Sequence, residues 1–145
     1  MKHTKVKALL SGSKVNTEVN AKGWVRTFRN NQFIALNDGS TIHNIQCVVD
    51  FENTAEETLK RITTGAAISV IGNLVESQGA GQNFEIQVTK LEILGDSDAE
   101  KFPMQPKKHS LEFLRENAHL RVRTNAFGAI MRVRSVLAHA VHTYF

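Results

Sequence analysis

Two arginines, two phenylalanines and a glutamine have the chemistry needed to hold an unstacked nucleobase. Arg26 and Phe28 share one parity of a β-forming run, and Arg29 lies at its end. Phe33 and Gln46 belong to the two runs that follow. An aromatic ring stacks on a base, an amide hydrogen-bonds a base edge, and arginines bind phosphates. If they share an exposed surface, these side chains predict a binding site for single-stranded nucleic acid.

Strand alternation decides which of these residues share a surface, because successive side chains point to opposite faces. In the second run, Ile34 and Leu36 share one face and Phe33 lies on the other. In the third run, an apolar set that includes Cys47 alternates with a set that includes Gln46. The apolar sets are the natural core face, so we predict that Phe33 and Gln46 point outward. Without further information, an exposed Phe33 fits a protein–protein contact as well as a nucleic-acid site.

The order of the expected elements indicates an all-β fold. The expected strands cover about residues 18–28, 32–37, 41–51, 67–76 and 83–94, with Asp38-Gly39 as one hairpin turn and Gly79-Ala80-Gly81 as another. A short helix is expected over 55–62, between the third and fourth strands. This is the order of an OB-fold, a five-stranded Greek-key barrel that binds oligonucleotides on its strand 2–3 face. Another small β-barrel and an open meander sheet are the alternatives.

The chain changes character after the last expected strand. We expect a barrel domain over 1–95, a polar, proline-containing linker over 96–109, and helices over 110–145. Ser110 is the expected N-cap of a short helix, and a longer one begins near Thr124. The apolar spacing of the longer helix is unbroken at Phe145, so we expect the natural protein to continue.

Composition is that of a globular protein with a basic bias. The 145 residues carry a net charge of +4, and residues 1–30 contribute seven basic side chains against Glu18 alone. A basic segment suits a polyanion, although a solvated lysine face explains it equally well. The chain has no apolar run of membrane-spanning length and no recognisable signal peptide. With one cysteine, Cys47, a cytoplasmic protein is expected.

Three stretches of sequence make the chain resemble a known family. Residues 22–29, Lys-Gly-Trp-Val-Arg-Thr-Phe-Arg, resemble the first barrel strand of the anticodon-binding domain of class IIb aminoacyl-tRNA synthetases. Residues 104–115 and 118–125 resemble the bacterial asparaginyl-tRNA synthetases in particular. The resemblance covers essentially the whole chain.

The resemblance implies roles for individual residues. Arg29, Phe33 and Gln46 match three positions that recur at the anticodon site of the family. There the phenylalanine stacks on the middle anticodon base, a uridine, and the glutamine reads its edge. Arg26 and Phe28 are expected neighbours of the site. Glu85 resembles a position near the first anticodon base.

The resemblance also implies a larger enzyme and its partners. An asparagine–tRNA ligase uses ATP and Mg²⁺ to charge tRNA(Asn), whose anticodon stem-loop is the expected partner here. The last helix resembles class II motif 1, so homodimerisation is expected through Phe127, Ile130, Met131 and Leu137. Motifs 2 and 3 do not occur in this sequence, so we expect no catalytic residue, metal site or cofactor within it. The rival reading is a barrel that binds single strands nonspecifically or binds proteins.

Overall fold

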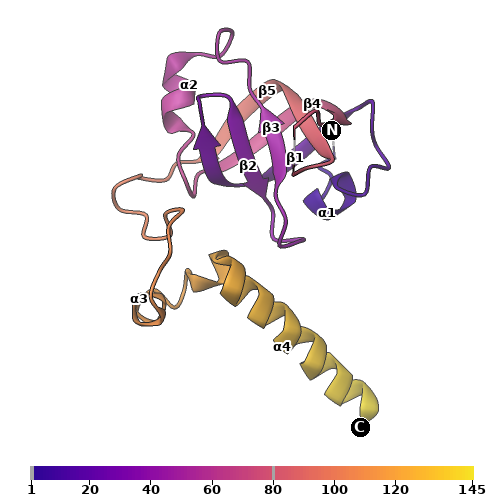
Figure 1. The fold of residues 1–145 in the computed structure, drawn as a ribbon, viewed down its shortest axis with the longest axis vertical. Helices are drawn as coiled ribbons and strands as arrows, with labels where there is room; N and C mark the ends of the chain where they lie inside the picture. The colour runs from indigo at the N-terminus through magenta and orange to yellow at the C-terminus, as the bar shows by residue number, and fades with distance from the viewer. Residues whose placement is uncertain (1, 80) are drawn as a thin grey trace. The chain divides into compact units, whose positions relative to one another are not determined.

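The computed structural model describes residues 2–79 and 81–145, which form two compact units (Figure 1). The first unit ends at Phe102 and the second begins at Pro103, inside the segment expected to be a linker. The elements of the first unit are α1 (Val6–Leu9), β1 (Thr17–Arg29), β2 (Phe33–Asn37), β3 (Ile45–Val48), α2 (Glu56–Arg61), β4 (Ala67–Glu76) and β5 (Phe84–Gly95).

The five strands form a closed barrel in the order β1-β2-β3-β5-β4, with β4 pairing back to β1. Neighbouring strands are antiparallel, except that β3 and β5 run parallel. Helix α2 lies between β3 and β4 in the chain. This architecture confirms the predicted five-stranded OB-fold. Of the expected hairpin tip at residues 79–81, Ala80 lies outside the described residues.

The interior of the barrel is built from the apolar parity of each strand. Ile34, Leu36 and Cys47 are fully buried, as the alternation in β2 and β3 predicted. Burial raises the pKa of the Cys47 thiol to about 12, so this cysteine remains a neutral core residue at physiological pH. The other fully buried or nearly fully buried side chains of the strands are Val19, Ala21, Val25, Ile45, Ile68, Val70, Leu74 and Ile86.

Helix α1 joins the barrel core although it contains only four residues. Val6 and Leu9 are fully buried in the same cluster as the strand side chains. The loop after β2 holds the start of the helix, since the backbone N–H of Val6 donates to Asp38 Oδ2 at 3.1 Å and that of Lys7 donates to Ser40 Oγ at 3.0 Å. Asp38 therefore caps a helix that is more than 30 residues away in sequence.

Strand β3 begins later than its sequence pattern predicted, because a side chain organises the residues before it. The Asn37 amide donates to the carbonyl oxygens of Thr41 at 3.1 Å and His43 at 2.9 Å. These bonds fold residues 41–44 into a loop, so the strand begins at Ile45. The strand ends at Val48, whereas the pattern predicted an end near Phe51. Hydrogen bonding between an asparagine side chain and the nearby backbone competes with the strand ladder.

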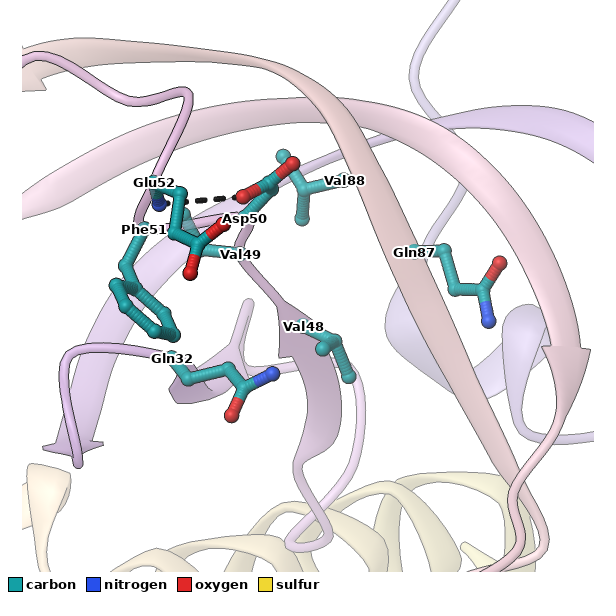
Figure 2. A pocket seen from close by; sticks show the side chains of 8 residues that line it. All are labelled: Gln32, Val48, Val49, Asp50, Phe51, Glu52, Gln87 and Val88. Carbon is teal, nitrogen blue, oxygen red and sulfur yellow. Dashed lines mark hydrogen bonds between the residues drawn. The ribbon is translucent and has the colours of Figure 1, made fainter.

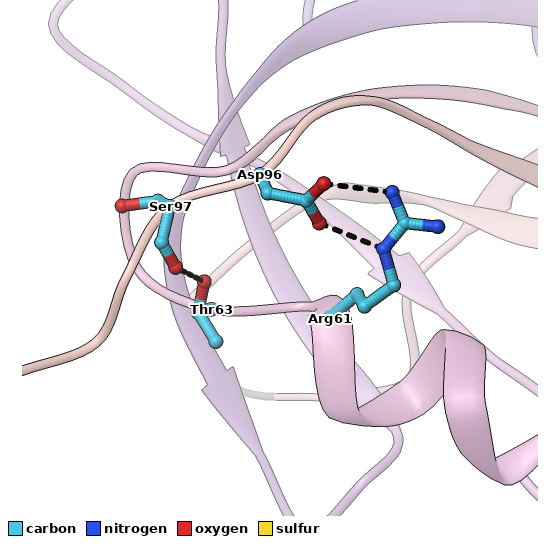
Figure 3. Close-up of polar contacts among 4 residues, drawn as sticks. All are labelled: Arg61, Thr63, Asp96 and Ser97. Atoms are coloured by element: carbon cyan, nitrogen blue, oxygen red, sulfur yellow. Dashed lines mark hydrogen bonds and ion pairs between the residues drawn. The ribbon is translucent and has the colours of Figure 1, made fainter.

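The residues directly after β5 are held against the end of α2 (Figure 3). Arg61 makes a two-pronged ion pair with Asp96, with Nε–Oδ1 at 2.7 Å and Nη2–Oδ2 at 2.8 Å. Thr63 Oγ1 donates to the carbonyl oxygen of Ser97 at 2.5 Å, and Ser97 Oγ donates back to that of Thr64 at 2.9 Å. The beginning of the expected linker is thus part of the barrel unit.

The second unit is helical and contains α3 (Leu111–Glu116), a 3₁₀ turn over Arg121–Arg123, and α4 (Asn125–Tyr144). Ser110 and Thr124 cap the two α-helices by accepting from the backbone N–H groups three residues on, at 3.2 and 3.4 Å. The cap at Ser110 and the start of α4 at Asn125 agree with the sequence prediction. Within the described residues, no helix is long and apolar enough to span a membrane.

Candidate nucleic-acid interface

The barrel carries two rows of outward-facing side chains that cross β1, β2, β3 and β5. The pairing register aligns Thr27, Ala35, Gln46 and Glu85 in one row and Arg29, Phe33, Val48 and Gln87 in the next. None of these residues is fully buried, whereas the rows on either side of Gln46 contain the buried Cys47 and Ile45. The two rows therefore form one continuous outer surface, which we call the reading face.

The first feature of the reading face is an aromatic ring beside an arginine. Arg29 ends β1 and pairs directly with Phe33, the first residue of β2. The tight connection between them uses Asn30 and Asn31 with φ of 54° and 51°, a left-handed conformation that asparagine tolerates. Arg29 is exposed and Phe33 is half-buried, so both residues remain at least partly accessible to solvent.

The second feature is a hydrogen-bonded pair that joins β3 to β5. Gln46 and Glu85 lie opposite each other on the two parallel strands, and Gln46 Nε2 donates to Glu85 Oε2 at 3.1 Å. The same carboxylate oxygen accepts from Ser77 Oγ at 2.8 Å and from Gln82 Nε2 at 3.3 Å. Side chains from β3, β5 and the β4–β5 connection thus converge on one oxygen atom.

Strand β1 departs from simple alternation at Arg26. The register shifts between Val25 and Thr27, so β1 carries one residue more than β2 at this point. As a result Phe28 pairs with the fully buried Ile34 and packs against the core. Phe28 therefore lies on the core side of β1, and Thr27 takes the outward position beside Ala35.

Arg26, the extra residue at this shift, is half-buried. Its backbone carbonyl accepts from Thr64 Oγ1 at 3.4 Å. Partial burial lowers the pKa of its guanidinium from the ordinary value, but arginine keeps its charge at any physiological pH. Of the six predicted site residues, the structure brings Arg29, Phe33, Gln46 and Glu85 onto one face, with Arg26 and Phe28 at its edge or beneath it.

A shallow hollow of about 270 Å³ lies at one end of the reading face (Figure 2). Val48 and Gln87 belong to both the hollow and the reading face. The Asp50 carboxylate is already occupied, because it accepts from the backbone N–H groups of Glu52 and Asn53 and from the Asn53 side chain. The remaining lining residues are Gln32, Val49, Phe51, Glu52 and Val88.

The sequence pattern did not single out four contributors to this surface: Thr27, Gln87, Ser77 and Gln82. Thr27 depends on the register shift, which has no sequence marker in β1. Gln87 lies two residues after Glu85 and shares its face by alternation, so the OB-fold order could have identified it. Among the described residues, no group of three or more His, Cys, Asp or Glu side chains is placed to bind a metal ion.

Comparison with known proteins agrees with this geometry. Residues 19–94 match the tRNA anticodon family model, described as an OB-fold nucleic acid binding domain. The whole chain is 56% identical to an asparagine–tRNA ligase of Porphyromonas gingivalis and 55% identical to one of Cytophaga hutchinsonii. It spans 32% of the length of each of these relatives, about a third.

Solved structures of similar fold cover nearly all of the chain. The asparaginyl-tRNA synthetase of Pyrococcus horikoshii, in complex with asparaginyl-adenylate, superposes with a TM-score of 0.81 at 25% identity. That match covers 99% of this chain and 34% of the archaeal one. From the family match and the closed five-stranded barrel together, the chain belongs to the OB-fold nucleic acid binding domains of the tRNA anticodon family.

Proposed function

We propose that the reading face binds the anticodon loop of tRNA(Asn), as the anticodon-recognition part of an asparagine–tRNA ligase. The observation that carries this proposal is the register that sets the half-buried Phe33 beside the exposed Arg29, one row from Gln46. An accessible ring, a cation and an amide on one face supply stacking, phosphate binding and edge recognition together. The similarity of the whole chain to about a third of asparagine–tRNA ligases supports the choice of tRNA.

The resemblance to the family assigns each residue of the proposed site a role that its side chain can perform. Phe33 stacks on the middle base, Gln46 hydrogen-bonds its edge, and Arg29 binds a neighbouring phosphate. Glu85 accepts hydrogen bonds from the first anticodon base. Arg26 adds positive charge at the edge of the face, and Phe28 supports it from the core side.

The ligase activity would belong to a longer protein of which this chain is about a third. That protein would use ATP and Mg²⁺ in the cytoplasm to activate asparagine and charge tRNA(Asn). Helix α4 leaves apolar side chains in solvent, Ile130 and Leu137 among them, at 52% and 60% exposed. We propose that this stripe, with Phe127 and Met131, forms part of the dimer interface of the ligase. Residues 1–95 would be the anticodon domain, 96–109 the connection, and 110–145 the start of the catalytic domain.

A binding titration tests the proposal directly. The chain is titrated with a tRNA(Asn) transcript and with the same transcript carrying a different anticodon. We expect a clear preference for the asparagine anticodon, by about tenfold or more, because each well-read base contributes about 1–3 kcal/mol. Equal affinity for the two transcripts would instead support a nonspecific single-strand-binding barrel, and no binding of either would favour a protein-interaction barrel.

A further inference from the structure

The hydrogen bond between Gln46 and Glu85 fixes which end of the Gln46 amide faces the carboxylate. An amide has an oxygen that accepts and a nitrogen that donates, and the two ends exchange places by a rotation of half a turn. A carboxylate oxygen only accepts. With Gln46 Nε2 at 3.1 Å from Glu85 Oε2, the opposite orientation would bring two acceptor oxygens together.

The carboxylate is itself held in place by the connection between β4 and β5. Ser77 Oγ donates to Glu85 Oε2 at 2.8 Å, and Gln82 Nε2 donates to the same oxygen at 3.3 Å. Ser77 is held in turn, since its Oγ accepts from the backbone N–H of Gly79 at 3.2 Å. All three side chains that touch this oxygen are half-buried, so solvent competes less with these bonds than at an open surface.

A fixed amide has a consequence for the bases it can accept. Uracil presents an acceptor at O4 beside a donor at N3, and cytosine presents a donor at N4 beside an acceptor at N3. The two edges therefore have the same shape and opposite hydrogen-bonding order. A glutamine that rotates freely can match either order, whereas one held in a single orientation matches one and opposes the other.

We propose that Glu85 is a positioning residue, which locks the orientation of the Gln46 amide and so makes it select uracil over cytosine at the middle anticodon position. This inference rests on the proposed function and adds a source of specificity to it. The selecting group is the pair formed by Gln46 and Glu85, because glutamine alone does not distinguish the two pyrimidines.

The substitution Glu85→Gln tests this lock on the orientation of the Gln46 amide, and it hardly changes the shape of the side chain at position 85. The new amide can donate or accept, so it accommodates Gln46 in both orientations. Two stem-loop RNAs are titrated that differ only in uridine or cytidine at the middle anticodon position. The unsubstituted chain should prefer uridine by about tenfold or more, and E85Q should reduce that preference to about twofold.

Two controls separate the lock from other effects of the same change. Glu92→Gln removes an equal charge from an exposed position of the same strand, and it should leave the uridine preference unchanged. In a Gln46→Ala background, the preference should already be low, and adding E85Q should lower it no further. This non-additivity is the signature of a residue that acts through Gln46.

The outcomes are distinguishable. If the unsubstituted chain binds the two RNAs equally, both the proposed function and the lock are overturned. If it prefers uridine and E85Q keeps that preference, only the lock is overturned, even when E85Q binds both RNAs more weakly through a lost contact to the first base. A drop caused by E85Q that is equally large in the Q46A background would show that Glu85 contacts the middle base itself, and would also overturn the lock.

Discussion

The barrel and helix α4 differ in whether their apolar side chains are buried. Leu36 in the barrel is fully buried, whereas none of the residues of α4, all of them described, is buried, and Leu137 is 60% exposed. The barrel makes its own interior by closing on itself. The apolar stripe of α4 is suited to burial against another surface. The proposed recognition chemistry therefore involves side chains of the barrel alone, and the proposed dimer interface involves those of the helix.

The largest effect should come from a matched pair of leucine truncations in the two regions. Leu36→Ala removes a fully buried side chain from β2, so the free energy of unfolding should fall by about 2–5 kcal/mol. Leu137→Ala removes the same atoms from solvent, so the change should stay within about 0.5 kcal/mol. Urea denaturation measures both, followed by the fluorescence of Trp24 in β1 for the barrel and by far-UV circular dichroism for α4. Equal losses would mean that α4 is as well packed as the barrel.

The next effect concerns RNA binding and should be confined to the barrel. Phe33→Ala should weaken binding of the tRNA(Asn) transcript by about 1–3 kcal/mol, the usual loss for a base-stacking ring. Thermal stability should change little, since Phe33 lies on the outer face of β2. Phe127→Ala in α4 is the matched control and should leave the affinity unchanged. A steep loss of stability with normal affinity of the folded fraction would place Phe33 among the structural residues.

A smaller effect concerns the stability of the barrel and its dependence on pH. Burial raises the pKa of Asp38, but hydrogen bonds from Ser40 and from the Val6 N–H outweigh it, and the net pKa is lowered. A lowered pKa means that the carboxylate stabilises the barrel fully above its unfolded pKa of about 4, and that this contribution disappears as the pH falls through the folded pKa. Asp38→Asn should therefore cost about 1 kcal/mol at neutral pH.

Melting temperatures measured from neutral pH down to about pH 3 check the sign of this prediction. The difference between the native chain and D38N should shrink toward the acid end. Glu92→Gln, on exposed β5 surface, controls for the change in net charge. A difference that stays constant across the range would show that the cap at α1 does not depend on the charge of Asp38.

The smallest change in stability should follow removal of the whole helical unit. A chain shortened to end at Phe102 should keep barrel stability within about 0.5 kcal/mol and keep its affinity for the anticodon stem-loop. Self-association that depends on concentration should be lost with the α4 stripe, which light scattering detects. The cut belongs after Phe102 because its ring lies next to Gly65, where an added Cβ would come within 2.8 Å of it. Loss of RNA binding in the shortened chain would contradict the proposal that the barrel alone binds RNA.

Much of this structure could be predicted from sequence because the relevant patterns are local. The apolar parity of β2 and β3, the order of the strands, the cap at Ser110 and the start of α4 near Thr124 are read from neighbouring residues. The outward position of Phe33 and Gln46 follows from the same parity. These predictions needed only alternation and helix-capping chemistry.

The unpredicted features depend on contacts between distant segments. The register shift at Arg26 reverses the side of β1 on which Phe28 lies, and only pairing with β2 reveals it. The bond from Gln46 to Glu85 joins residues 39 positions apart, through a parallel pairing of β3 with β5. Asp38 reaches back 32 positions to cap α1. Such contacts are properties of the folded topology, so no local pattern encodes them.

The pairing of β1 with β4, which closes the barrel, limits the rate at which the barrel folds. Thr17 pairs with Leu74 and Trp24 with Ala67, so β1 must wait for a strand made more than 40 residues later. Folds dominated by such distant pairings fold in milliseconds to seconds, whereas a helix of the length of α4 forms in about a microsecond or less. During synthesis, the edge of β1 that β4 will cover stays open until β4 has emerged. Slow closure therefore makes this unpaired edge the segment most exposed to wrong pairing in the newly made chain.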